Sequence, residues 1–486
     1  MEPTTSPEFV GRQAELSILE AAFRSREAEL VAVIGRRRVG KTFLVRQAYR
    51  GRICFEMTGL QHGGKTEQLR NFSYQLAAFA GSDFPLEVPQ DWQAAFQLLI
   101  SYLKVKDLAQ QRTVLFFDEI PWIATPKSGF LEAFGLFWNS WAVQQNLVIV
   151  ICGSAASWMI NKVVNHKGGL YNRITKRIFL KPFHLRETEE FLQRRGIRMD
   201  RYQLLQVYMT MGGIPHYLKE LAPGKSAVQN IDDICFAENG LLNAEFDNLY
   251  LALFEAAERH VSIIRALAVV RGGMARKELL QAAGLSDGGG SSKVMEELIS
   301  SGFITGYYDF KKKRKNIRYR LTDEYSLFFL KFIEPRRNEG RGTWQRLSQT
   351  QTWKSWSGYA YEGVCLKHIR QLKAAMGIDG LYAEASTFYQ RGAGQLPGVQ
   401  VDLLLDRNDH IINLFEIKFY NGSYVLDKAA ALAIRQKMGL FATASNTRKQ
   451  LQVTLVTTFP ILENEHSRGL IDQALTMDDL FREVEM

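Results

Sequence analysis

The sequence is poor in cysteine and proline, with four and 12 among 486 residues. Its cysteines lie far apart and match no metal-ligand spacing, which excludes a zinc-finger type of protein and predicts reduced thiols in a cytoplasmic protein (Cys54, Cys152, Cys235 and Cys365). No apolar run approaches the roughly 20 residues that a membrane-spanning helix needs, so we expect no membrane partner. The first residues, M-E-P-T-T-S-P-E, contain no basic segment followed by an apolar core, so we expect no secretion signal.

The composition is that of a globular chain, with 46% hydrophobic and 23% charged residues. The length predicts about two to four domains. The net charge of +10 and the isoelectric point of about 9.2 favour a polyanionic partner such as a nucleic acid.

The most specific motif lies near the N-terminus, where residues 35–42 read G-R-R-R-V-G-K-T after the apolar run Leu30–Ile34. Gly35 and Gly40 let the backbone curl until successive N–H groups face phosphate oxygens. Lys41 can then reach the terminal phosphates, and the Thr42 hydroxyl can ligate a magnesium ion. The motif predicts binding of a nucleoside triphosphate with Mg²⁺; the alternative is an ordinary glycine-rich turn.

A pair of acids ends a second apolar run, Val114–Phe117, at the end of a strand where ligands sit in parallel sheets. Asp118 is the expected partner of the magnesium ion, and Glu119 is expected to orient and polarise the attacking water. The alternative is a solvated strand end. Ser154 ends the next apolar run and is a candidate sensor of the γ-phosphate, or else a helix N-cap.

Short apolar runs alternate with amphipathic segments up to about residue 180, and the runs are continuous rather than alternating. This pattern predicts a parallel sheet covered on both faces. The expected strands are Leu30–Ile34, Ile53–Met57, Thr113–Asp118, Leu147–Cys152 and Arg177–Leu180. Residues 186–255 are expected to form a helical lid.

The pattern changes near residue 260, where three short helices precede two alternating strands, as in a winged helix-turn-helix. The expected helices are Val261–Val270, Ala275–Ala283 and Ser291–Ser301, and the strands lie at 303–308 and 317–321. The hairpin tip is basic and fits contact with a phosphate backbone, or else is a solvated tip (Lys311, Lys312, Lys313, Arg314 and Lys315). The third helix offers few base-reading side chains, which predicts weak sequence specificity or a protein spacer.

After a polar segment at 336–350, expected to be a linker, the sequence predicts a small α/β domain. Asp402 opens one expected strand, and Glu416 and Lys418 lie on one face of the next. A hairpin would bring Asp402 beside them, where two carboxylates can bind Mg²⁺ and Lys418 can assist attack on a phosphodiester. Glu362 on the first helix is a candidate third acid, and Gln436 could complete the site. The alternative is a cross-strand ion pair.

The first set of motifs resembles the archaeal-type ATPase family, in the AAA+-like STAND group of P-loop NTPases. The resemblance lies in Phe9–Arg12, in the arginine-rich phosphate loop that includes Arg38, in Leu170–Thr175 and in Gly212–Pro215. It implies that ATP is the nucleotide and that Arg12 and Pro215 lie near its base. It also makes Arg173 a candidate for contact with the γ-phosphate, within or between subunits; otherwise Arg173 is a surface residue.

The Asp402, Glu416 and Lys418 pattern resembles the PD-(D/E)xK nuclease superfamily, specifically the nuclease-like C-terminal region of archaeal-type ATPases, with Val401 where proline is often found. The implied α/β architecture has a P-loop NTPase core (1–185), a helical lid (186–255), a winged helix-turn-helix (256–335), a linker (336–350) and a restriction-endonuclease-like domain (351–486).

The implied function is an ATP-hydrolysing switch coupled to a Mg²⁺-dependent nuclease acting on DNA. Two alternatives remain. One is an ATP-gated DNA-binding regulator with an inert nuclease fold. The other is an interaction switch that forms homo-oligomers on binding ATP.

Overall fold

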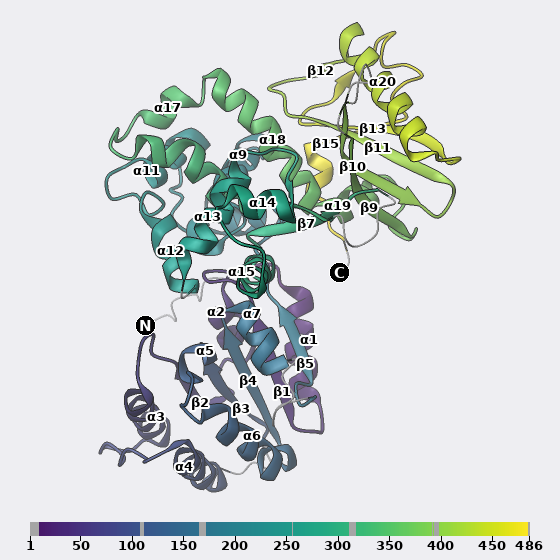
Figure 1. The fold of residues 1–486 in the computed structure, drawn as a ribbon. Helices are drawn as coiled ribbons and strands as arrows, with labels where there is room; N and C mark the ends of the chain where they lie inside the picture. The colour runs from purple at the N-terminus through teal and green to yellow at the C-terminus, as the bar shows by residue number, and fades with distance from the viewer. Residues whose placement is uncertain are drawn as a thin grey trace. The chain divides into compact units, whose positions relative to one another are not determined.

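The computed structural model describes residues 9–106, 111–164, 172–254, 256–310, 317–390, 392 and 398–484. The chain divides into two compact units, Met1–Lys181 and Pro182–Met486 (Figure 1). The boundary between the two units lies four residues before residue 185, where the ATPase core was expected to end. None of the helices within the described ranges is long and apolar enough to cross a membrane.

The first unit is built on a five-stranded, fully parallel sheet in the order β2-β3-β4-β1-β5. Strands β1, β3 and β4 are buried along their whole length, as expected for continuous apolar strands covered on both faces. Each predicted strand is present to within a few residues. Their bounds are Glu29–Ile34 (β1), Ile53–Thr58 (β2), Thr113–Asp118 (β3), Leu147–Gly153 (β4) and Lys176–Phe179 (β5).

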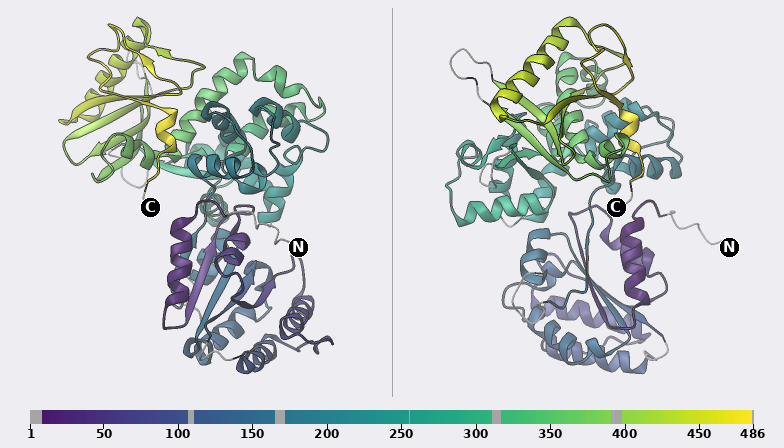
Figure 2. Two further views of the ribbon diagram at one scale, coloured as in Figure 1. Left: turned by 180° about the vertical axis from the view of Figure 1, so that it is seen from behind. Right: turned by 90° about the vertical axis from the view of Figure 1, so that its right-hand side faces the viewer.

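Helices pack on both faces of this sheet. Helix α1 contacts β1 and β5 (Figure 2), while an aromatic cluster from α4 and α6 packs against Phe117 of β3 (Phe96, Phe130 and Phe134). The helices are Gln13–Arg24 (α1), Lys41–Ala48 (α2), Lys65–Ala80 (α3), Trp92–Val105 (α4), Ile120–Ile123 (α5), Phe130–Ser140 (α6), Ala142–Gln144 (η1), Ala156–Trp158 (α7) and Met159–Val164 (η2).

The strand order decides where the functional loops meet. Because all five strands are parallel, the segments that follow β1, β3 and β4 emerge at one edge of the sheet. Strand β4 lies between β1 and β3. Ser154, directly after β4, is therefore placed between the phosphate loop and the acidic pair.

The second unit begins with helices where a helical lid was expected: Leu185–Arg194 (α8), Arg201–Met211 (α9), Pro215–Leu218 (α10), Ala227–Cys235 (α11) and Glu245–Leu253 (α12). The two glycines before Pro215 have a packing reason. A Cβ atom on Gly213 would lie 1.9 Å from the Phe183 carbonyl oxygen, and Gly212 has a φ of 65°. The turn between α9 and α10 therefore requires residues without a side chain.

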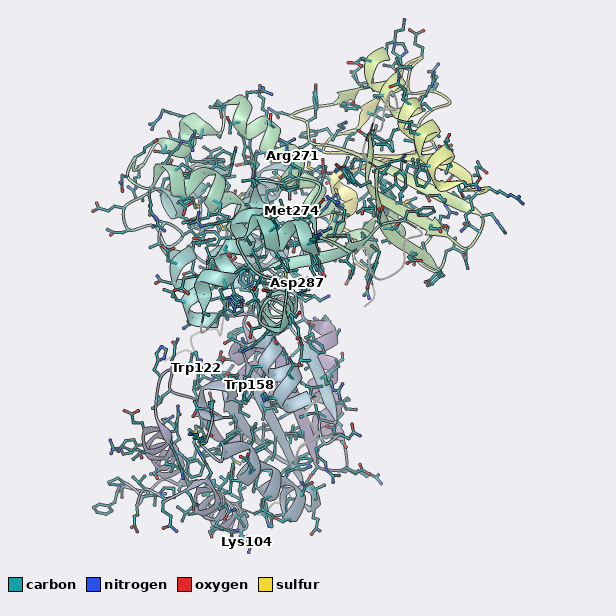
Figure 3. The ribbon with its side chains drawn as sticks, in the orientation of Figure 1. Lys104, Trp122, Trp158, Arg271, Met274 and Asp287 are labelled. Carbon is teal, nitrogen blue, oxygen red and sulfur yellow. The ribbon has the colours of Figure 1, made fainter. Side chains whose placement is uncertain are left out.

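The three helices and two strands that were expected for a winged helix-turn-helix are also present in this unit. The elements of this part are Ala257–Ala268 (α13), Met274–Ala275 (β6), Arg276–Ala282 (α14), Gly289–Ser300 (α15), Ile304–Tyr308 (β7) and Ile317–Leu321 (β8), with the sheet order β6-β8-β7. Figure 3 labels Met274 on β6 and Asp287 just before α15. The basic tip, Lys311–Lys315, lies outside the described residues.

The prediction of a polar linker at 336–350 is wrong. The helices after β8 reach into this segment on both sides of a short turn region: Glu324–Phe328 (α16), Phe329–Ile333 (η3), Glu334–Arg336 (η4) and Thr343–Leu347 (α17). Trp344 is fully buried against Phe236 and Phe328, and the Asp232 carboxylate accepts hydrogen bonds from the Gly342 and Trp344 amides at 2.6 and 2.7 Å. Trp344 and these two backbone hydrogen bonds hold the segment against the rest of the unit.

The C-terminal part is a mixed sheet in the order β15-β13-β11-β10-β9. Strands β9, β10 and β11 are antiparallel, whereas β11, β13 and β15 are parallel. The expected first helix, which carries Glu362, starts at Gln351 and is interrupted at His368. The elements are Gln351–Lys367 (α18), Ile369–Ala375 (α19), Ala383–Gln390 (β9), Val399–Arg407 (β10), Ile411–Lys418 (β11), Tyr424–Val425 (β12), Lys428–Ser445 (α20), Gln450–Thr457 (β13), Ile461–Leu462 (β14), Gln473–Thr476 (β15) and Met477–Phe481 (η5).

Candidate nucleotide site and carboxylate cluster

The phosphate loop joins β1 to α2 and packs closely on the end of β5. A Cβ atom on Gly35 would lie 2.4 Å from the Leu180 carbonyl oxygen, so only glycine fits there. Gly40 has a φ of 92° and Arg38 a φ of 74°, so both adopt the left-handed conformation. These positions turn the chain from the strand into the helix, as the glycine spacing predicts.

Lys41 is buried at the first position of α2 and its ammonium group is folded onto the loop. It donates to the carbonyl oxygens of Gly35 and Arg36 at 2.9 and 3.1 Å, and lies 4.0 Å from a Glu119 carboxylate oxygen. The side chain thus lies among the groups that would surround a terminal phosphate.

The acidic pair faces the same loop. The Thr42 hydroxyl donates to Asp118 Oδ2 at 2.6 Å, and the Glu119 amide donates to the other oxygen of Asp118 at 3.0 Å. Burial raises the pKa of Asp118, although the Thr42 hydrogen bond opposes this shift. A hydroxyl in contact with a carboxylate is the oxygen donor set that Mg²⁺ prefers, so the residues fit the expected ion.

Glu119 is held by Ser154. Its Oε2 accepts from both the amide and the hydroxyl of Ser154, at 3.0 and 2.8 Å. Glu119 also has a φ of 49°, a left-handed conformation that costs a non-glycine residue about 1 kcal/mol or more. Ser154 therefore lies where its position after β4 predicts, and its partner in this arrangement is the Glu119 carboxylate.

Two labelled tryptophans lie at the same end of the first unit (Figure 3): Trp122 on α5 and Trp158 on α7. The Arg37 guanidinium lies 5.9 Å from the centre of the Trp122 ring. Lys104, near the end of α4, lies at the opposite end of the unit. The functional loops are thus gathered at one edge of the sheet.

The predicted adenine-side segment packs against the phosphate-loop helix. Phe9 stacks on Phe43 with ring centres 5.9 Å apart. Arg12 is buried, donates to the Lys181 carbonyl at 2.6 Å and lies 3.7 Å from Glu15. Pro215 opens α10 in the second unit, and its place near the base stays a prediction.

The prediction that Arg173 contacts the γ-phosphate within one chain is wrong. Arg173 is exposed and lines an open hollow together with residues 26–28, which precede β1, and residues 145–146, which precede β4. It therefore lies at the edge where the strands begin, whereas the phosphate loop lies where they end. Contact with a nucleotide in another copy stays a prediction.

Comparison with known proteins agrees with this site. Residues 9–221 match a family described as an ATPase domain predominantly from Archaea. The matched range contains the phosphate loop, the acidic pair and Ser154. The match supports a P-loop ATPase that binds ATP, and the assignment of residues 35–42 to the phosphates stays a prediction.

An uncharacterized protein of Methanocaldococcus jannaschii is 23% identical over 420 residues, which cover 85% of this chain and 87% of that protein. Among solved structures, a Walker-type ATPase of Pyrococcus abyssi has a TM-score of 0.49 at 18% identity and covers 66% of this chain and 96% of its own. The ORC2 protein of Aeropyrum pernix has a TM-score of 0.44 at 15% identity and covers 72% and 98%.

The C-terminal candidates gather around Glu362 on α18. Burial, and then the charge of Asp402, raise the pKa of Glu362 to about 8, while Arg320 and Lys418 oppose the shift and Glu416 adds to it. Among the described residues, Glu362 has no hydrogen bond or ion pair. The structure thus brings all four predicted residues into one electrostatic neighbourhood.

Each of the other two acids, however, is held by cations or amides of the chain. Asp402 Oδ1 accepts from Arg320 at 3.0 Å and from Gln400 at 2.7 Å. Glu416 pairs with Lys418 at 2.7 Å and with Lys437 at 2.6 Å. Burial opposes ionisation of Glu416, but Lys437 and Lys418 lower its pKa overall.

The strand geometry explains why Asp402 and Glu416 have separate partners. The β10–β11 pairing runs only to Leu403 opposite Phe415, one step before Asp402 and Glu416 would face each other. An irregularity in the β10–β9 pairing lies between Val401 and Leu404, on either side of Asp402, and a bulge of this kind changes the direction of side chains locally. Within the described ranges, no three acidic, histidine or cysteine side chains form a group that could hold a metal ion. As arranged, these residues do not fit the expected magnesium ion.

Three residues at this cluster were missed by the sequence analysis: Arg320, Gln400 and Lys437. Gln436 was the expected helix residue, but it is exposed, and its neighbour Lys437 contacts Glu416 instead. The signal in the sequence that could have pointed to this contact is Arg320, a charged residue on a strand. It is followed directly by the buried Leu321. A buried arginine requires a carboxylate partner.

Proposed function

We propose that this protein is an ATP-hydrolysing switch whose C-terminal part is a nuclease-like output module acting on DNA. The observation that carries the first half is the contact network in which Lys41, Thr42, Asp118, Glu119 and Ser154 meet at one sheet edge. It brings together a lysine for the phosphates, a hydroxyl and a carboxylate for the metal ion, and a carboxylate for the attacking water.

The roles follow from the contacts. Amides of the phosphate loop hold the phosphates, and Lys41 moves from the loop carbonyls to the terminal phosphate. Thr42 and Asp118 would hold Mg²⁺, which neutralises phosphate charge when bound. Glu119 orients and polarises the attacking water, and Ser154 fixes the direction of that carboxylate.

Phosphate release from ATP tests this half. Lys41→Ala should lower the rate about 10²-fold or more, because a positioned charge at the phosphates is lost, and Glu119→Gln should do the same. Lys65 is a matched control, since it opens α3 as Lys41 opens α2 but is exposed. Wild-type turnover in Lys41→Ala would contradict the proposal.

The support for the nuclease half is the topology of the mixed sheet together with the grouping of Glu362, Asp402, Glu416 and Lys418. Nicking of a supercoiled plasmid with Mg²⁺ or Mn²⁺, with and without ATP, tests it. Cleavage should be lost in Asp402→Ala and Glu416→Ala. Equal cleavage by wild type and Asp402→Ala would exclude this cluster as the nuclease site.

A second candidate, an ATP-gated regulator with an inert nuclease fold, is favoured by the two lysines on Glu416. It predicts binding of DNA without cleavage by any metal. The exposed side chains of α15 include Ser292, Lys293 and Glu296, which are few and of mixed charge, so either candidate would show weak sequence preference. Size-exclusion chromatography of wild type and Lys41→Ala, with and without ATP, tests the oligomeric switch.

A further inference from the structure

The base of the wing is joined to the C-terminal sheet. The Phe310 amide, directly after β7, donates to the Thr387 carbonyl of β9 at 2.8 Å, and the Tyr389 amide donates to Asp309 Oδ1 at 3.2 Å. Phe310 is buried in the core that contains Phe388. Strands β7 and β9 lie close together in Figure 1. The wing therefore uses the C-terminal sheet as its partner at this end.

One basic side chain of the same wing lies in the carboxylate cluster. Arg320 of β8 is 5% exposed and contacts Asp402 at 3.0 Å. Gln400, which holds the same Asp402 oxygen, packs against the loop between α13 and β6. A Cβ atom on Gly272 in that loop would lie 3.0 Å from Gln400. Two parts of the winged helix thus hold Asp402, one directly and one through Gln400.

This contact competes with a divalent cation. A guanidinium on the Asp402 oxygen repels a second cation and uses the electron pairs that the second cation would need. Without the wing, Asp402 would lose its cation while Glu362, which has no hydrogen bond or ion pair among the described residues, remains beside it. Loss of Arg320 would leave these two carboxylates with one cation fewer, although Lys418 remains near Glu362, and this favours an ion with hard oxygen ligands.

We propose that the wing is a latch on the nuclease-like cluster: Arg320 occupies the place of a metal ion at Asp402, and undocking of the wing from β9 opens the site. The proposal rests on the proposed function of the C-terminal module and explains why that module does not fit a metal in the docked arrangement. It names winged-helix movement as the event that allows metal binding.

The first test is Mn²⁺ binding to the full-length protein, measured by isothermal titration calorimetry. Arg320→Gln should gain a site that binds about tenfold or more tightly than any site in wild type outside the phosphate loop. The double variant Arg320→Gln, Asp402→Asn should lose that site again. Arg276 is the control, because it lies on α14 of the same winged helix and pairs with Asp287, not with Asp402.

The second test uses wild type and does not depend on a variant that folds. Millimolar Mn²⁺ should speed amide hydrogen exchange in β7, β8 and β9, because metal binding has to displace Arg320 and the wing with it. Helix α11, distant from the cluster in sequence, should not change. Unchanged exchange in the wing at millimolar Mn²⁺ would overturn the latch, as would a folded Arg320→Gln protein with no added Mn²⁺ site.

Plasmid nicking separates this proposal from the nuclease proposal. If Arg320→Gln gains the Mn²⁺ site but cuts no DNA under any condition, the latch stands and the nuclease assignment fails. If wild type and Arg320→Gln cut equally without nucleotide, the nuclease assignment stands and the latch fails. If Arg320→Gln cuts about tenfold or more faster than wild type, both stand.

Discussion

At the scale of single residues, the ATPase site depends on how Glu119 is held. Ser154 donates twice to one oxygen of the Glu119 carboxylate, and Lys41 lies 4.0 Å from the other. The amide donor survives any substitution of the side chain, whereas the hydroxyl donor does not. Ser154 should therefore act on catalysis through the orientation of Glu119 and not through binding of ATP.

Ser154→Ala should lower the maximal rate of ATP hydrolysis about 2- to 10-fold, since one hydrogen bond of about 0.5–1.5 kcal/mol is lost. The KM for ATP should stay unchanged. Ser157→Ala is the control, because Ser157 in α7 accepts a hydrogen bond from Asn161 and contacts neither acid. A rise in KM at constant kcat would show instead that Ser154 binds the nucleotide.

Two glycines of the second unit should respond in opposite ways to alanine. Gly213→Ala places a Cβ atom 1.9 Å from the Phe183 carbonyl oxygen and should cost about 1–3 kcal/mol of the free energy of unfolding. Gly439 lies within α20 with open space around it, so Gly439→Ala should add roughly 0.5–1 kcal/mol. Denaturant unfolding measures both, and a neutral Gly213→Ala would mean that the turn before Pro215 relaxes freely.

At the scale of elements, His368 joins the lid helices to the C-terminal part. Its ring lies between α18 and α19, accepts a hydrogen bond from the Leu185 amide of α8 at 3.1 Å and contacts the Val364 carbonyl at 2.7 Å. Burial lowers the pKa of His368 to about 3. The ring is therefore neutral in the folded protein and would be protonated below its usual pKa of about 6.5 only after unfolding.

This difference makes the second unit sensitive to acid. Between pH 6.5 and 3 the unfolded chain binds one more proton at this residue, so the stability falls as the pH falls. The loss from pH 7 to pH 5 should be about 2 kcal/mol. Hydrogen exchange of peptides from α8 and α18 measures it. His368→Gln should remove this part of the pH dependence, while His62→Asn, at an exposed histidine of the first unit, should keep it.

The elements also show what the sequence could and could not predict. The strands of the first unit and the phosphate loop were predictable, because continuous apolar runs and fixed glycine spacing are local signals. The packed segment around Trp344 was not, because its partners Phe236 and Phe328 come from other elements. The Arg320–Asp402 contact spans 82 residues, and no local pattern encodes such a pairing.

At the scale of the whole molecule, the net charge of +10 is the property that concerns nucleic acids most directly. The five basic residues of the wing tip, Lys311–Lys315, carry a charge equal to half of this excess. They lie outside the described residues. The base of the wing is engaged by β9, and α15 presents few side chains that can read bases. Binding of DNA should therefore depend on phosphate charge and little on sequence.

Fluorescence anisotropy with two duplexes of unrelated sequence tests this expectation. Their dissociation constants should agree within about threefold, and both should rise about 100-fold between 50 and 200 mM salt if four phosphates are neutralised. Replacing residues 311–315 by serine should flatten that salt dependence, because the released counterions belong to the tip. Lys428 and Arg435, exposed on α20, serve as a control for removal of charge elsewhere. If the serine variant kept the full salt dependence, the contact would have to come from another surface, and the wing would be a protein spacer.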